Sequence, residues 1–141
     1  MLDEAAAEFD KEIAISPREP WSYENRGTLW LDKGDSDRAL PLFREALSLN
    51  PKMPLSLAGI GKAYVRQSKP EEAIPYLERA VELQPDSANL HYQLGQAYLK
   101  ANRKSDAQRE MAEAGRLQTE AREKQEARIS GKLPPPEAPL P

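Results

Sequence analysis

The chain has 141 residues, a formal charge of −3, one histidine and no cysteine. This length suits one ordinary domain or a short array of repeats, and the missing cysteine excludes disulfides, thiolate catalysis and cysteine-ligated metals. The slightly acidic balance gives no basic surface for nucleic acid, and the lack of a run of 18 apolar residues argues against direct membrane insertion.

Residues 1–17 predict one amphipathic helix, over residues 3–16, with no partner helix before it. Its apolar stripe is Leu2, Ala5, Ala6, Phe9 and Ile13. We expect this uncovered apolar edge to cause weak self-association. The segment is either part of a longer array with more repeats upstream or an N-terminal cap, and the first interpretation is favoured. The start lacks the features of a secretory signal, which favours a soluble cytoplasmic protein over a periplasmic or secreted one, although an upstream signal removed earlier would leave the compartment open.

Residues 20–51 predict two short helices joined by a tight turn. Apolar and small residues recur at helical spacing on both sides of residues 32–36. Gly34 suits a left-handed helix end, and Asp35 or Ser36 suits the cap of the next helix. The second helix stops before Pro51, because a residue that precedes proline avoids the α region. Helices joined in this way pack antiparallel.

The same pattern returns along the chain at one fixed interval. The residues that keep this interval are Pro17, Pro51 and Pro85; Gly27, Gly61 and Gly95; Trp30, Tyr64 and Tyr98; Ala5, Ala39, Ala73 and Ala107; and Ala46, Ala80 and Ala114. A fixed period of this size indicates a stacked array of one supersecondary unit. It places units at residues 20–51, 54–85 and 88–119, and residues 1–17 match the second half of an earlier unit.

The three glycines lie in the middle of predicted helices, where glycine costs about 1 kcal/mol relative to alanine. Three of them at one period indicate that two backbones approach closely there. We expect the aromatic residues Trp30, Tyr64 and Tyr98 to fill the space beside these glycines and to give a dense helix interface.

In this register the chain resembles the tetratricopeptide repeat (TPR) family, whose period is about 34 residues. The residues that carry the resemblance are Tyr23, Gly27, Trp30, Ala39, Phe43, Ala46 and Pro51; Leu57, Gly61, Tyr64, Ala73, Leu77, Ala80 and Pro85; and His91, Gly95, Tyr98, Ala107, Met111 and Ala114. Three positions depart from it, because Arg26 replaces a leucine, Glu12 an alanine and Thr119 a proline. The resemblance implies an all-α fold, an α-solenoid of about three and a half helix-turn-helix units.

The C-terminal end predicts an extended charged helix followed by a proline-rich tail. Residues 120–128 are rich in good helix formers, and Glu120 and Lys124 form an opposed pair one turn apart. Residues 129–141 are rich in proline, and we expect a disordered, polyproline-II-like tail. A solvated end is the favoured reading, and a ligand for a proline-binding domain is the alternative.

No catalytic constellation is visible in the sequence. His91 occupies a packing position of its unit, and we expect a packed side chain rather than a ligand or a base. The paired acids Glu71 and Glu72 suit the start of a helix. The carboxylates have no histidine partners that would make a metal site. We therefore expect no enzyme activity, no cofactor and no metal.

The resemblance implies that the first helices of successive units line a concave groove for a peptide or partner helix. Carried over by repeat position, the groove residues are Trp21, Glu24, Asn25 and Thr28; Leu55, Ala58, Gly59, Lys62 and Arg66; and Asn89, Tyr92, Gln93 and Gln96. Trp21 and Tyr92 would act as anchors, and Lys62 and Arg66 as cations. The alternative is that these are ordinary solvated helix residues.

One type of TPR groove is excluded by the residues present. Chaperone-binding members clamp a terminal carboxylate with Lys, Asn, Asn, Lys and Arg. Asn25 matches one asparagine, but Leu55 and Gly59 stand where Lys and Arg are needed. If the comparison starts one unit later, Ala58, Lys62 and Gln93 stand at the clamp positions, and no further unit supplies the remaining ones.

The favoured function is a non-enzymatic interaction module that binds a protein or peptide partner. The alternatives are a structural or assembly spacer, and a regulatory repeat region of a larger protein.

Overall fold

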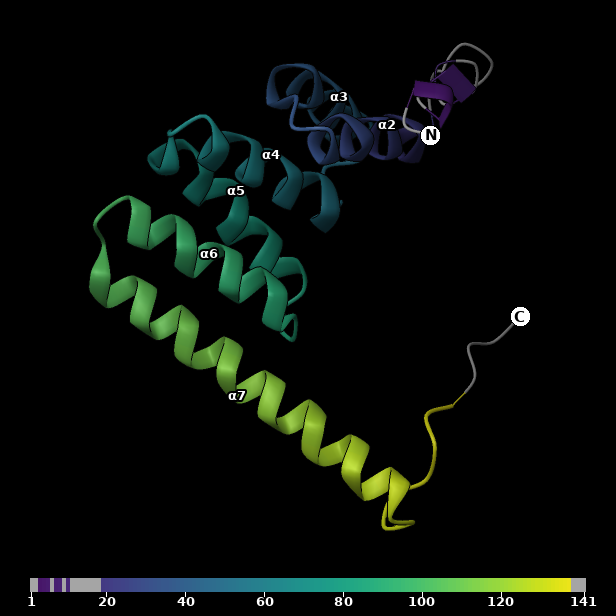
Figure 1. Cartoon of the computed structure of the whole chain (residues 1–141), viewed down its shortest axis with the longest axis vertical. Helices are drawn as coiled ribbons and strands as arrows, with labels where there is room; N and C mark the ends of the chain where they lie inside the picture. The colour runs from purple at the N-terminus through teal and green to yellow at the C-terminus, as the bar shows by residue number, and fades with distance from the viewer. Residues whose placement is uncertain (1–2, 6, 9, 11–18, 138–141) are drawn as a thin grey trace.

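The computed structural model describes residues 3–5, 7–8, 10 and 19–137 (Figure 1). Its helices are α2 (Pro20–Asp32), α3 (Ser36–Leu49), α4 (Pro54–Arg66), α5 (Pro70–Leu83), α6 (Ala88–Lys100) and α7 (Lys104–Ile129). The described residues contain no strand. The predicted all-α solenoid, with an extended charged C-terminal helix, is therefore confirmed.

The helices stack in chain order, and each of them packs on its neighbours. α2 pairs with α3, α4 with α5 and α6 with α7, while α3 and α5 carry the stack to the next pair. The first helices also contact one another, α2 with α4 and α4 with α6. Among the described helices, α3, α5 and α7 make no such contact with one another. The first helices therefore form one layer and the second helices another, as expected for a solenoid (Figure 1).

The turn inside each unit has the same left-handed helix end. Gly34, Ser68 and Asn102 occupy the same position of successive units and all have positive φ, at 87°, 61° and 62°. The amide that follows each of them donates to the carbonyl of the unit's aromatic residue, from Asp35 to Trp30 at 2.8 Å, from Lys69 to Tyr64 at 2.9 Å and from Arg103 to Tyr98 at 2.8 Å. These hydrogen bonds satisfy carbonyls that the helix end leaves without a partner. The turn predicted at Gly34 is thus present in all three units.

The close approach predicted at Gly27, Gly61 and Gly95, which we call the glycine seam, is confirmed. The side chains that lie against these glycines come from the second helices. A Cβ atom added at Gly61 would lie 2.5 Å from Cγ of Leu77. The second-helix side chains lie against the glycines, Phe43 on Gly27, Leu77 on Gly61 and Met111 on Gly95. The predicted aromatics Trp30, Tyr64 and Tyr98 belong to the hydrophobic clusters of this interface. Each of them is three positions after its glycine on the same helix, so the side chains that lie directly on the glycines come from the second helices instead.

Phe43 also joins the first unit to the second. A Cβ atom at Gly59 on α4 would lie 2.5 Å from the Phe43 ring, and one at Gly27 on α2 would lie 3.0 Å from it. The ring is only 1% exposed. One aromatic side chain thus sits between glycines of two successive first helices and fixes their spacing.

The described residues of the N-terminal segment contact α2 in the way that α3 contacts α4. Asp3 pairs with Lys33, and at the same positions one repeat later Gln67 donates to Asp37 at 2.6 Å. Asp10 pairs with Arg26 at 2.5 Å, which explains why an arginine is tolerated where the family has leucine. The remaining stripe residues Leu2, Ala6, Phe9 and Ile13 lie outside the described residues, so self-association through this edge stays a prediction.

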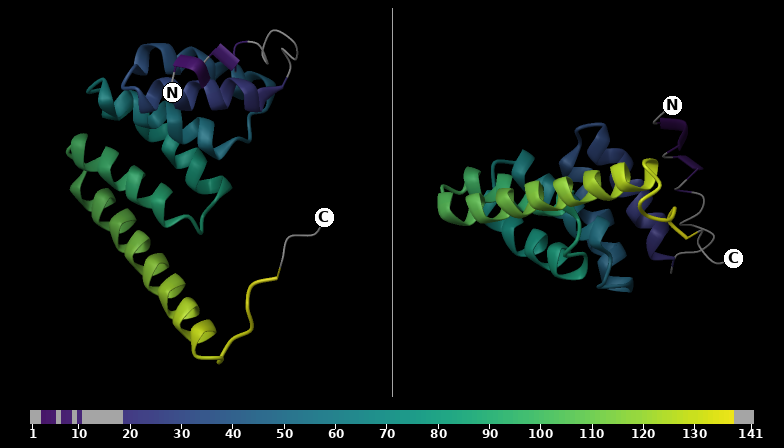
Figure 2. Two further views of the ribbon diagram at one scale, coloured as in Figure 1. Left: turned by 45° about the vertical axis from the view of Figure 1, so that its right-hand side comes forward. Right: turned by 90° about the horizontal axis from the view of Figure 1, so that it is seen from below.

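The last helix is longer than its counterparts. α7 has 26 residues, whereas α3 and α5 have 14 each. It therefore continues beyond the end of α6, as the left view of Figure 2 shows. Gly131, with a φ of 76°, ends the helix, and residues 132–137 are exposed.

We predict opposite effects of alanine at two helical glycines. Gly61→Ala should lower the free energy of unfolding by about 1–3 kcal/mol, because the new methyl group overlaps Leu77 in the seam. Gly115→Ala should raise it by up to about 1 kcal/mol, because nothing lies within 4 Å and alanine is the better helix former. Urea unfolding of both variants measures this, and equal effects at the two sites would contradict the close approach.

Candidate binding groove

Three adjoining hollows open along the layer of first helices. The first, of about 350 Å³, lies between Glu24, Leu55 and Asn89. The second, of about 230 Å³, lies between Thr28, Lys62 and Asn89. The third, of about 280 Å³, runs from Lys62 and Val65 to Tyr92. All three are lined by Asn89 and Gln93, so they form one groove over α4 and α6 with α2 at its edge.

Most of the predicted groove residues are brought together in these hollows. Those that line at least one hollow are Glu24, Thr28, Leu55, Ala58, Gly59, Lys62, Asn89, Tyr92, Gln93 and Gln96. Trp21 and Asn25 lie on α2 but line none of the three. Trp21 is nevertheless 45% exposed.

Arg66 lies apart from the groove. Its guanidinium donates to the carbonyl of Leu31 near the end of α2. It lines a separate polar hollow near the turns, together with Trp30, Lys33 and Arg38. We infer that Arg66 contributes to packing between the first two units rather than to the groove.

The sequence did not predict several apolar residues that line the groove. Met53 precedes α4, Pro54 is the first residue of α4 and Leu90 lies on α6, and all three line the hollow that contains Leu55. Val65 on α4 lines the hollow that contains Tyr92. Placement by repeat position assigns only the outward positions of each first helix. The proline at the first helical position of α4 was the available signal, because it marks where the turn meets the helix.

Exposed apolar side chains stand at both ends of the groove. Leu55 is 55% exposed and Tyr92 is 46% exposed. The Tyr92 hydroxyl accepts a hydrogen bond from Gln96 at 3.0 Å. A large apolar side chain that stays in water is suited to cover a partner's apolar surface.

The polar groups of the groove fall into two sets. The Glu24 carboxylate accepts a hydrogen bond at 2.7 Å from Ser56, which is fully buried, and so helps to join α2 to α4. The side chains of Lys62, Asn89 and Gln93 have no hydrogen bond or ion pair within the part of the chain that the structure describes. They remain available to a ligand.

His91 lies behind the groove in a buried ion pair. Its Nδ1 is 2.6 Å from the Glu110 carboxylate on α7, and its Nε2 is 2.8 Å from the Pro85 carbonyl. Both partners are acceptors, so the imidazolium, with two N–H donors, fits the site best. Burial alone lowers the pKa of His91, but these hydrogen bonds and the charges of Glu110 and Glu113 raise it above its ordinary value.

We predict that the third unit loses stability as the pH rises. The folded pKa of His91 is raised, so its contribution is complete below the unfolded value of 6.5 and is lost as the pH passes the folded pKa. The free energy of unfolding should therefore fall in urea titrations as the pH rises above the unfolded value of 6.5 and through the raised folded pKa of His91.

The matched control replaces the pair by its counterpart in the second unit. Leu57 and Tyr76 stand there, so the control is the double variant His91→Leu with Glu110→Tyr. It should show a flatter pH dependence over the same range. An equal slope in both proteins would exclude the ion pair as its cause.

Sequence comparison agrees with the repeat pattern. One family model, described as tetratricopeptide repeat, matches residues 22–53, and another, described as TPR repeat, matches residues 61–102. The chain belongs to the tetratricopeptide repeat family. No curated protein sequence matches it.

Solved structures of TPR solenoids have the same fold. A crystal structure of MamA superposes with a TM-score of 0.80 at 16% identity, over 86% of this chain and 71% of that one. MamA from Desulfovibrio magneticus RS-1, residues 41 to the end, gives 0.78 at 21%, over 84% and 67%. The RS-1 MamA double mutant ArsTM gives 0.79 at 21%, over 85% and 67%. At these identities the likeness is one of fold.

Two features of the described residues bear on other functions. None of the helices there is long and apolar enough to cross a membrane. No group of three or more His, Asp or Glu side chains is arranged there to hold a metal ion.

Proposed function

We propose that this TPR module binds a peptide segment of a partner protein in the groove over α4 and α6. The observation that carries the proposal is the meeting of three hollows at Asn89 and Gln93, between the exposed Leu55 and Tyr92. Repeat modules of this family ordinarily serve protein interaction, and we infer that the chain is not an enzyme.

The available side chains suit a peptide. Asn89 and Gln93 lie one helical turn apart on α6, so their amides face the groove together. An amide both donates and accepts hydrogen bonds, which matches the main chain of a peptide. Apolar side chains of the ligand would cover Leu55 and Tyr92, and an acidic group would pair with Lys62.

A peptide display library, panned on the whole chain, tests this proposal. We expect selected peptides to combine apolar residues with an acidic one. Their affinity should fall at least tenfold in the variant Asn89→Ala with Gln93→Ala, a loss of about 1.4 kcal/mol or more. Lys62→Glu should weaken the acidic peptides most strongly. Binding is measured by calorimetry.

The matched control is Arg79→Glu. Arg79 is exposed on α5 and lines none of the three hollows, so the same charge reversal there should leave binding unchanged. Thermal melts of all variants check that the fold survives, as surface changes usually alter stability by only about 0.5 kcal/mol. Peptides that bind the groove variants as tightly as the parent would overturn the proposal.

A further inference from the structure

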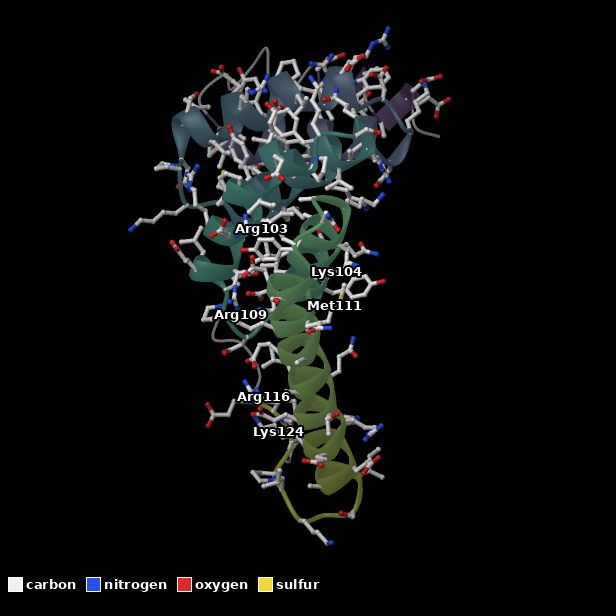
Figure 3. All side chains as sticks on the ribbon, turned by 90° about the vertical axis from the view of Figure 1, so that its left-hand side faces the viewer. Arg103, Lys104, Arg109, Met111, Arg116 and Lys124 are labelled. Carbon is white, nitrogen blue, oxygen red and sulfur yellow. The ribbon has the colours of Figure 1, made fainter. Side chains whose placement is uncertain are left out.

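The second half of α7 leaves the stack. α7 has 26 residues against 14 in α3 and α5, and the difference is about 18 Å of helix at a rise of about 1.5 Å per residue. Its only buried residues are Ala107 and Ala114, both in the first half. In Figure 3 the labelled Arg116 and Lys124 lie on the part that runs away from the other helices. We call residues 117–129 the arm.

Pairs of opposite charge run along the arm and the turn before it. Arg116 bonds to Glu113 and, at 3.0 Å, to Glu120. Glu120 in turn bonds to Lys124 at 2.9 Å. Pairs at these spacings each stabilise an isolated helix by about 0.2–0.5 kcal/mol. The arm therefore has local support for its helix and acts as a spacer.

The arm ends in a defined turn that carries a run of prolines. Gly131 is left-handed, and the amides of Lys132 and Leu133 donate to the Ala127 carbonyl at 2.8 and 3.1 Å. These bonds turn the chain away from the helix axis (Figure 1). Residues 133–137 follow, exposed and without regular secondary structure; we call them the proline segment.

The proline segment is preorganised for one type of recognition. Its sequence is Leu133, Pro134, Pro135, Pro136 and Glu137. The ring of each proline restricts its own φ to the value of a polyproline II helix and pushes the residue before it towards the extended region. Three in succession favour that helix, which loses little entropy on binding. Leu133 is 43% exposed beside them.

We propose that the proline segment is a ligand for a partner domain with a shallow groove lined by aromatic side chains. Such domains bind polyproline II helices by packing the proline rings against aromatic faces. Glu137 follows the three prolines, and it would pair with a basic residue at that end of the partner's groove. The arm holds the segment clear of the stack, so a folded domain can reach it.

This inference is independent of the peptide groove. The groove lies on α4 and α6, whereas the proline segment follows the far end of α7. The chain would then bind one partner and be bound by another.

Biosensor measurements with the whole chain test the inference. The probes are purified SH3, WW and EVH1 domains. We expect at least one of them to bind, and the variant Pro134→Ala with Pro135→Ala and Pro136→Ala to bind it at least tenfold more weakly. Lys62→Glu is the matched control, because it alters the peptide groove alone and should leave this binding unchanged. Thermal melts should agree for all three proteins, since the prolines lie outside the core.

Two results would overturn the inference. One is that no domain of the three classes binds the parent, or that the triple variant binds equally well. The other is that Lys62→Glu removes the binding, which would place the probe in the peptide groove. Peptide binding by the groove is measured separately, so failure of either proposal leaves the other standing.

Discussion

The stack depends on side chains of second helices lying against glycines of first helices. Phe43 is the central case, because its ring contacts Gly27 in its own unit and Gly59 in the next. Any other residue at these glycines would bring a Cβ atom to 3.0 Å or less from the ring. The spacing of α2 and α4 follows from this contact, and with it the position of the groove edge that α2 forms. This close packing has a cost, because glycine is a poorer helix former than alanine.

Much of this fold was predictable from the sequence, because the repeat carries its own register. The fixed interval predicted a repeated helix-turn-helix unit, and Gly34 marked a left-handed residue in the first turn. The sequence did not identify the left-handed residues of the later turns, since Ser68 and Asn102 adopt a positive φ without being glycine. There the conformation is imposed by the surrounding hydrogen bonds.

The groove was predictable only at the level of helix faces. A repeat position shows which way a residue leaves its helix, but not where a long side chain ends. Arg66 has a groove position by sequence, yet it reaches the Leu31 carbonyl, which lies in the last turn of α2. The Leu31 carbonyl lacks its usual helical partner and accepts a turn hydrogen bond from the Gly34 amide at 3.0 Å, and the Arg66 guanidinium is its second donor. A short side chain such as that of Asn89 cannot reach far from its helix. Asn89 therefore lines the hollows on the helix face that its repeat position indicates.

The length of α7 has a mechanical consequence. A helix of 26 residues is about 39 Å long, so a tilt of about 10° at its root moves its tip by about 7 Å. The root of α7 is tied to α6 by the bond between Glu110 and His91, and α6 also carries Asn89. Small rearrangements of α6 are therefore magnified at the tip, as they would be by a lever with its pivot at the third unit.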